Sequence, residues 1–204
     1  MATSKTSDTR LEKVTRNVVL KGLNDIMFDR YAGDNKTQLA WNQKIYLSPG
    51  TNILCLPTSN IVSFLSAHNT NSAPKRLRDA RQFKKIANAC LSFVMIKGNG
   101  NNPQYIHFQR DGKDIEVGTF GDDHEKLSGL YLDRRVARLD KGIPNPKERP
   151  VLPAPWELSF LLSILPNSEI KEQEIMNLFK EGGLAIGLGT FRGVFGKFEV
   201  ASWE

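Results

Sequence analysis

Apolar and polar residues alternate most regularly between residues 156 and 165, where every second side chain is large and apolar. A period of two over this length predicts a strand with one buried face. Shorter patterns of the same kind predict strands over 17–23 and 195–203. The run 91–96, which is rich in strand-forming residues, predicts another strand.

Two segments instead have the spacing of an amphipathic helix. In residues 59–68 the apolar side chains recur at i, i+3 and i+4, and a hydroxyl residue just after Pro57 can cap the first turn. Residues 169–181 show the same spacing. Ser168 can cap the start of this second helix, and Gly182-Gly183 is expected to end it.

The order strand, helix, strand, strand, helix, strand is that of an α+β protein with a ferredoxin-like (RRM-like) βαββαβ core. A polar, proline-rich stretch separates the second and third of these strands, and its Asp111-Gly112 pair is typical of a hairpin turn. We therefore expect three parts: a flexible N-terminal tail over 1–15, a ferredoxin-like core made of 16–97 and 156–204, and an inserted β-rich subdomain over 98–155.

Composition mainly excludes classes of protein. The chain has 204 residues, of which 40% are hydrophobic and 25% charged, as in ordinary globular proteins. No apolar run approaches the ~20 residues of a membrane helix, and the N-terminus lacks the apolar core of a signal peptide. Two cysteines and three scattered histidines make neither a disulfide framework nor a metal site. We expect a cytoplasmic protein with no cofactor, no bound metal and no membrane partner.

The positive charge of the chain is concentrated in one stretch. The net charge is +6, and residues 74–85 hold six basic residues and one acidic residue, a net +5. Arg78, Arg81 and Lys85 have helical spacing, so one helix face can follow a phosphate backbone. The alternative is an ordinary solvated surface helix.

A second basic cluster, Arg134, Arg135 and Arg138, lies near Tyr131. Bases of a single strand stack well on tyrosine rings and guanidinium planes. The alternative is that these arginines pair with the neighbouring carboxylates Asp133 and Asp140.

The segment 187–196, GLGTFRGVFG, has four glycines in ten residues. Glycines permit positive φ angles and close backbone approach, and successive N–H groups of such a loop can cradle a phosphate. Arg192 can add a bidentate phosphate contact. The Walker and dinucleotide-binding patterns do not fit this segment. The alternative is that the glycines only make a tight crossing from helix to strand.

Three features together resemble the RAMP superfamily, whose members build CRISPR effector complexes, and in particular the backbone subunits that line up along guide RNA. They are a strand ending in Gly22-Leu23 before a polar loop, the segment 56–65 with Pro57 before the first helix, and the glycine-rich loop before the last strand. Position 58 is Thr where the family usually has Gly. The resemblance implies RNA binding, stacking into filaments, a thumb in the place of 98–155, and a phosphate contact at the helix start with Ser59 and Asn60.

The same resemblance implies where catalysis would lie. Some backbone subunits cut RNA with an acidic residue in the loop after the first strand, where this chain has Asp25, Asp29 and Asp34. Processing members use a histidine, and His68 follows the first predicted helix. One loop supplies no convincing cage for a divalent metal, so Asp29, Asp34 and His68 are only weak catalytic candidates.

These observations favour a binding protein over an enzyme. We expect it to bind single-stranded nucleic acid, RNA rather than DNA, mainly through phosphates, as a homo-oligomer or a subunit of a ribonucleoprotein complex. Two alternatives stay open: a metal-dependent endoribonuclease, and a structural or regulatory protein-interaction module of a phage. The expected nucleic-acid contacts are Ser59, Asn60, Lys75, Arg76, Arg78, Arg81, Lys85, Arg134, Arg135, Gly187, Gly189, Arg192 and Gly193.

Overall fold

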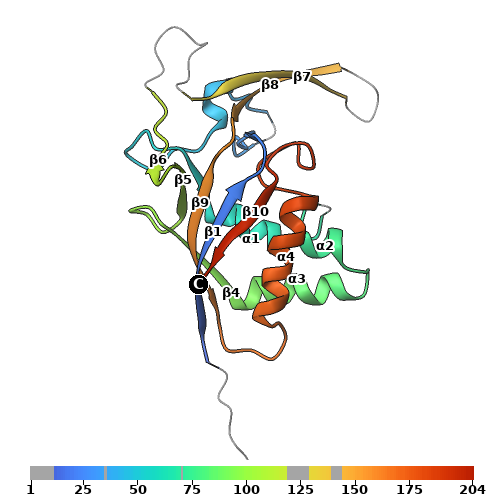
Figure 1. The fold of residues 1–204 in the computed structure, drawn as a ribbon. Coiled ribbons are helices and arrows are strands. Elements are labelled where there is room, and N and C mark those ends of the chain that lie inside the picture. The colour runs from blue at the N-terminus through green and yellow to red at the C-terminus, as the bar shows by residue number, and fades with distance from the viewer. Residues whose placement is uncertain (1–11, 35, 70, 119–128, 139–143) are drawn as a thin grey trace, which may run out of the picture.

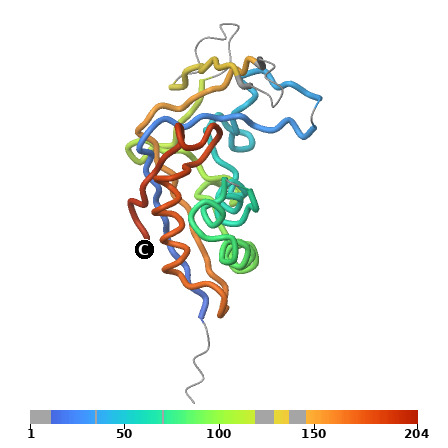
Figure 2. Tube along the Cα trace, turned by 90° about the vertical axis from the view of Figure 1, so that its right-hand side faces the viewer, coloured from blue at the N-terminus to red at the C-terminus, as the bar shows by residue number. Residues whose placement is uncertain are grey.

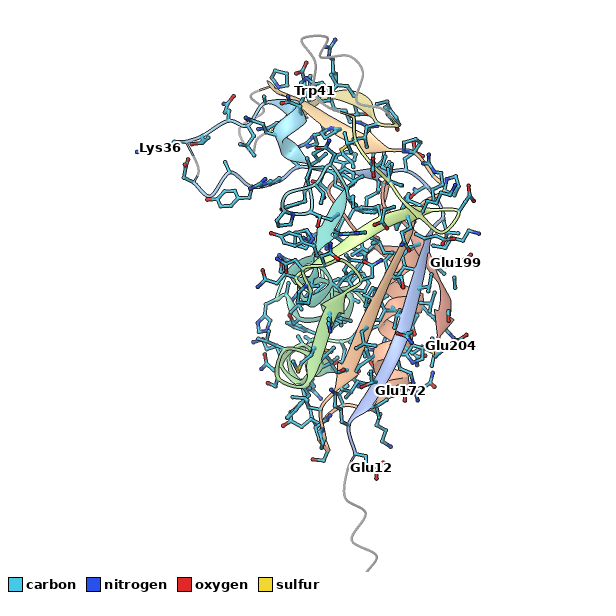
Figure 3. All side chains as sticks on the ribbon, turned by 90° about the vertical axis from the view of Figure 1, so that its left-hand side faces the viewer. Glu12, Lys36, Trp41, Glu172, Glu199 and Glu204 are labelled. Carbon is cyan, nitrogen blue, oxygen red and sulfur yellow. The ribbon has the colours of Figure 1, made fainter. Side chains whose placement is uncertain are left out.

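The computed structural model describes residues 12–34, 36–69, 71–118, 129–138 and 144–204. Within this part of the chain the protein is α+β, as predicted, with a seven-stranded sheet and a separate three-stranded sheet at one end (Figure 1). The helices gather on one side of the larger sheet, and the opposite face is free of helices (Figures 2 and 3).

The elements have the following bounds. The larger sheet contains β1 (Val14–Gly22), β3 (Cys55–Pro57), β4 (Val94–Gly98), β5 (Tyr105–Arg110), β6 (Lys113–Asp114), β9 (Glu157–Ile164) and β10 (Phe198–Trp203). The small sheet contains β2 (Ile26–Met27), β7 (Tyr131–Arg138) and β8 (Pro144–Leu152). The helices are α1 (Thr58–Ser66), α2 (Ala73–Leu77), α3 (Gln82–Phe93), α4 (Glu172–Ala185) and the short 3-10 helix η1 (Trp41–Lys44). None of the described helices has both the length and the apolar character needed to cross a membrane.

Strand β9 is the centre of the larger sheet. It pairs antiparallel with β1 from Val14↔Ile164 to Lys21↔Glu157, and its other edge pairs with β4 and β5. Its alternate residues are buried, as its period of two predicts. Strand β10 pairs with the free edge of β1, so the sheet runs β10-β1-β9 with β4 beyond.

Aromatic residues fill the space between this sheet and the helices. The Phe179 ring of α4 lies 5.7 Å from the Phe64 ring of α1 and 6.0 Å from the Phe160 ring of β9, measured between ring centres. All three side chains are buried. Removing such rings from water is the main favourable term that holds helix and sheet together.

The glycine pair in α4 has a different role from the predicted one. The helix begins at Glu172 rather than 169, Ser168 is not its cap, and it continues through Gly182-Gly183 to Ala185. A methyl group at position 182 would lie 2.6 Å from the Phe64 ring, and one at 183 would lie 2.4 Å from the carbonyl oxygen of Phe198. The two glycines therefore let α4 approach α1 and β10 closely instead of ending the helix.

The predictions for residues 74–96 were wrong in detail. Helix α3 extends to Phe93 and buries one face, so Leu91 is helical and β4 begins at Val94. The basic stretch is not one helix either, because α2 ends at Leu77 and α3 begins at Gln82. Consequently Arg78, Arg81 and Lys85 do not share a helix face.

The predicted tail and last strand also shift at their ends. Residues 1–11 lie outside the described part of the chain, and β1 begins at Val14, inside the expected tail. The last strand begins at Phe198 rather than 195 because the preceding residues belong to the glycine-rich loop.

The expected insertion divides between the two sheets. The predicted hairpin is confirmed: Asp111 and Gly112 both have positive φ and join β5 to β6. Strand β5 pairs with β9 and so joins the larger sheet, whereas β8 pairs with β2 on one edge and with β7 on the other. Residues 119–128 and 139–143 of this stretch lie outside the described part.

The close approach of Gly183 to the Phe198 backbone predicts that a larger residue at position 183 destabilises the protein. Ala normally stabilises a helix relative to Gly by up to ~1 kcal/mol. At this position we expect Gly183→Ala to lower the free energy of unfolding by about 1–3 kcal/mol, because the methyl group must displace the Phe198 backbone. Urea unfolding of both proteins measures the difference. Leu184→Ala, at an exposed position of the same helix, is the control and should change little. A Gly183→Ala protein as stable as the parent would contradict the packing described here.

Candidate nucleic-acid interface

The glycine-rich loop, residues 187–196, has a backbone that few other sequences can adopt. All four of its glycines have positive φ, between 73° and 91°. At Gly196 a side chain is also sterically impossible, since a Cβ atom would lie 1.9 Å from the carbonyl oxygen of Leu188. The glycines are thus required by the path of the chain, as the tight-crossing alternative states.

Most N–H groups of this loop are used inside the protein. Leu188 N donates to the Gly196 oxygen at 2.8 Å, and Gly193 N donates to the Ile186 oxygen at 2.7 Å. The Gly187 N–H donates to Gly182 in α4. The N–H groups of Gly187 and Gly193 are therefore engaged within the protein, and the phosphate contact expected at these glycines stays a prediction.

Other N–H groups attach the loop to the turn after β1. Gly196 N donates to the Asp25 oxygen at 2.7 Å, and Thr190 N donates to the Met27 oxygen at 2.9 Å. Figure 2 shows this part of the chain, red in the glycine-rich loop, lying against the blue segment that follows β1. The loop is consequently a fixed platform and not a free flap.

Arg192 is a half-buried cation with neutral partners. Its Nε donates to the Gly189 oxygen at 3.0 Å, and its Nη1 donates to the Asn71 oxygen. Burial lowers the pKa of this guanidinium. No carboxylate of the described residues pairs with it. Arg192 thus ties the loop to the segment before α2 and leaves a positive charge that no acid offsets.

The bond to Asn71 brings a basic stretch beside the loop. We call residues 73–85, which cover α2 and the start of α3, the basic segment. Five of its cations are exposed and have no ion pair within the described chain: Lys75, Arg76, Arg81, Lys84 and Lys85. Its one carboxylate, Asp79, accepts the N–H groups of Arg81 and Gln82. A strip of positive charge therefore adjoins the glycine-rich loop.

Arg78 is the exception in the basic segment. Its Nε lies 2.9 Å from Glu174 and its Nη1 lies 3.0 Å from Glu181, both on α4. The hydrogen bonds and charges of these two acids outweigh burial and raise the pKa of Arg78. This side chain therefore anchors α2 to α4, and the phosphate contact expected at Arg78 stays a prediction.

The small sheet meets the loop through β7. Tyr131 donates its hydroxyl to Asp25 at 2.7 Å, and Arg135 donates to Asp133 at 2.7 Å. The guanidinium of Arg135 also lies over the rings of Phe191 and Phe195. For Arg135 the alternative that it pairs with a neighbouring acid is therefore confirmed. Asp140 lies outside the described residues.

Arg134 remains accessible in this region. Its side chain is 70% exposed and forms a 3.0 Å ion pair with Glu148, itself largely solvated. Such exposed pairs contribute little to stability and exchange easily with other partners.

Phe191 is a residue that sequence reasoning missed. It has a φ of 53°, which is unusual for a bulky side chain and costs about 1–2 kcal/mol. Its side chain is nevertheless 48% exposed. The sequence did contain a signal, an aromatic residue in the middle of a glycine-rich loop.

Ser59 and Asn60 lie at the other end of α1 from this contact. The helix has Pro57 at its cap position, and Thr58 N donates to the Gln104 oxygen at 2.9 Å. Arg192, in contrast, contacts Asn71, which follows the end of α1. The structure thus joins the glycine-rich loop to the segment after this helix, and the phosphate contact expected at Ser59 and Asn60 stays a prediction.

The three catalytic candidates have separate structural roles. Asp29 pairs with Arg149 at 2.7 Å and lies 4.0 Å from Lys44. Asp34 accepts the N–H groups of Lys36 and Thr37 and the hydroxyl of Thr37. These bonds lower the pKa of Asp34.

Asp29 and Asp34 line one groove of about 780 Å³ together with Trp41, which Figure 3 shows at the end of the molecule formed by the small sheet. His68 is exposed and lies 3.2 Å from Asn88. No group of three potential metal ligands occurs among the described residues.

A Ser–His–Asp arrangement lies elsewhere and is enclosed. The Nε2 atom of His107 lies 3.1 Å from Ser48 Oγ, and its Nδ1 atom lies 2.7 Å from Asp114. Ser48 is 4% exposed and His107 is 6% exposed. This network joins the turn at Ser48 to the β5–β6 hairpin and gives a substrate no access to the serine.

Comparison with known proteins adds a fold relationship. Neither the protein-family models nor the curated proteins contain a significant match to this chain. Among solved structures, a similar chain belongs to the cryo-EM structure of the type III-B Cmr-β bound to cognate target RNA. The TM-score is 0.55 and the identity is 13%, over 95% of this chain and 61% of that chain. This chain thus spans about three fifths of its neighbour's length, and the two share a fold.

The contact between Tyr131 and Asp25 predicts how the ionisation of this tyrosine depends on pH. Burial, followed by the hydrogen bond to Asp25, raises the pKa of Tyr131 to about 12. Because the folded protein holds this proton more tightly than the unfolded chain, the contribution to stability is present below pH ~10 and is lost as the pH rises toward 12. We expect Tyr131→Phe to remove the latest-ionising tyrosine from an absorbance titration of phenolate.

The control for this titration is Asp25→Asn, which keeps the tyrosine and can still accept the Ala154 N–H. Without the carboxylate charge, Tyr131 should ionise earlier than in the parent protein. If Tyr131→Phe removed a tyrosine that ionises near its ordinary pKa, the contact would not exist in solution.

Proposed function

We propose that this protein binds single-stranded nucleic acid, RNA rather than DNA, mainly through its phosphate backbone. The observation that carries this proposal is the basic segment: five exposed cations without acidic partners lie next to Arg192, whose charge is also unpaired within the described chain. Such a strip suits a polyanion, because each phosphate neutralised releases a counterion.

The strand order supports a RAMP-like assignment. We infer a ferredoxin-like core from β1, β4, β9 and β10, since their order β10-β1-β9-β4 with antiparallel neighbours is the order four-one-three-two of that fold. The two crossovers run through α1–α3 and through α4. In this interpretation the core comes from 16–97 and 156–204, and the part of 98–155 in β7 and β8 is the thumb, with β5 and β6 added to the core sheet.

The fold neighbour supports the choice of RNA. Its structure is that of the Cmr-β bound to target RNA, a complex of the kind that the RAMP resemblance implies. We propose by analogy that this chain also works as a subunit of a multi-subunit ribonucleoprotein complex. The thumb sheet and the glycine-rich loop, which meet at Tyr131 and Asp25, would then flank the strand.

The geometry favours binding over catalysis. Asp29 is neutralised by Arg149, and Asp34 is occupied by the backbone of its own turn. A carboxylate that holds a divalent ion or accepts a proton must be accessible to it. Asp34 is exposed, but both of its carboxylate oxygens already accept hydrogen bonds within its own turn.

The experiment removes two charges of the basic segment without shortening its helix. In Lys75→Gln/Arg76→Gln we expect weaker binding of a short single-stranded RNA at moderate salt. We also expect the slope of log affinity against log salt to fall by about 1.4, since each phosphate contact to a single strand contributes about 0.7. Fluorescence anisotropy across a salt series measures both quantities.

Lys97→Gln/Lys113→Gln is the matched control, since it removes the same charge from exposed positions of β4 and β6. It should leave the slope unchanged. Equal slopes in both double variants would place the contact elsewhere. Absence of RNA binding at low salt would overturn the proposal and favour a protein-interaction module.

A further inference from the structure

Aromatic and cationic side chains are stacked where the glycine-rich loop meets β7. The guanidinium carbon of Arg135 lies 5.1 Å from the centre of the Phe191 ring and 4.9 Å from that of Phe195. The two ring centres are 6.3 Å apart. Phe195 is buried and packs with Met27 and Val151, whereas almost half of Phe191 is exposed. The stack therefore has one end fixed in the protein and one end open to solvent.

Phe191, the residue at the open end, has a backbone conformation that is unfavourable for a bulky side chain. Phe191 adopts a positive φ that bulky residues avoid, and its ring belongs to neither of the two buried apolar clusters. Packing of the interior thus gives no reason for an aromatic residue at this position. Backbone strain that brings a large apolar side chain to the surface is characteristic of functional sites.

The charge of the stack differs from that of the basic segment. Asp133 lies 2.7 Å from Arg135 and offsets its positive charge. The stack is therefore polarisable and close to neutral, which suits the face of an aromatic heterocycle rather than a phosphate.

We propose that Phe191, backed by Arg135, is a stacking platform for an unpaired nucleobase of the bound strand. The proposal rests on the proposed function and deepens it, because it assigns base contacts to the loop and phosphate contacts to the basic segment. Stacking accepts every base, so the platform adds affinity for single strands without reading their sequence. A paired base in a duplex does not expose its face and cannot use it.

Two probes of equal length and charge separate these contributions. One is a fluorescein-labelled oligoadenylate, and the other is an abasic strand with the same phosphates. We expect the parent protein to bind the oligoadenylate more tightly. Phe191→Ala should weaken oligoadenylate binding about 5- to 100-fold, the range found when one stacking residue is removed. Affinity for the abasic strand and the salt slope should not change, because no phosphate contact is lost.

Three further variants make the test specific. Val194→Ala alters an equally exposed apolar residue of the same loop and should have no effect. Phe191→Leu keeps an apolar side chain and the positive φ but lacks the ring, so it should behave like Phe191→Ala. Phe191→Tyr should bind like the parent protein. Thermal unfolding of each variant verifies that the loop is still folded.

The possible results distinguish failure of the stacking platform from failure of the proposed function. Equal affinity of the parent protein for both probes, with normal salt dependence, overturns the platform and leaves the proposed function standing. Parent-like binding by Phe191→Leu also overturns it and favours an apolar contact with a protein partner. Failure of both probes to bind at low salt overturns the proposed function itself.

Discussion

The short turn after β1, residues 24–27, is the support on which the rest of the interface depends. The Asn24 side chain donates to the Val194 oxygen and accepts from Lys197 N, and so it holds both sides of the end of the glycine-rich loop. The Asp25 carboxylate accepts from Tyr131 of β7 and from Ala154 N. One turn therefore fixes the loop, the small sheet and the entry to β9 relative to one another. Each such bond contributes about 0.5–1.5 kcal/mol net, and bonds to a carboxylate contribute about 1.5–3 kcal/mol.

This support explains how a strained residue persists in the loop. The positive φ of Phe191 is an unfavourable backbone conformation at a single residue. The loop around it is fixed by the hydrogen bonds of Thr190 to Met27, Gly193 to Ile186 and Gly196 to Asp25. Relaxing Phe191 alone would break several of these bonds, because its neighbours cannot move independently. The loop thus holds an aromatic ring in a defined position. Because the ring is already ordered, a ligand that binds it would lose less conformational entropy.

The α+β class, the central strand and the two main helices were predictable because burial on one face imposes a local period. The ends of the elements were less predictable, since contacts distant in sequence set them. Gly182-Gly183 looks like a helix stop, yet the partners that require it, Phe64 and Phe198, lie on other elements. Strand β5 belongs to the larger sheet because it pairs with β9. That strand begins at Glu157, 47 residues after β5 ends at Arg110, so no local sequence pattern reveals the pairing.

The candidate site shows the same limit. Composition located the basic segment and the glycine-rich loop, because charge and glycine content are visible in the sequence. The sequence does not show which of these cations are paired in the folded protein, because the partners come from distant parts of the chain. Arg78 and Arg135 pair with carboxylates, whereas Arg192 donates to carbonyl oxygens. Phe191 was overlooked because its significance lies in a backbone angle and in Arg135, which lies 56 positions earlier in the chain.

Arg78 fixes the position of the basic segment without adding to its unpaired charge. Two acids of α4 pair with the guanidinium of this side chain, which is 16% exposed, so the basic segment is attached to the core near its midpoint. The acids neutralise this anchor, and the cations that flank it keep their charge free for a ligand. A strip built this way combines a fixed position with a net positive field. In the proposed function, long-range attraction would bring a strand to this surface, where short-range contacts with the ordered loop would hold it.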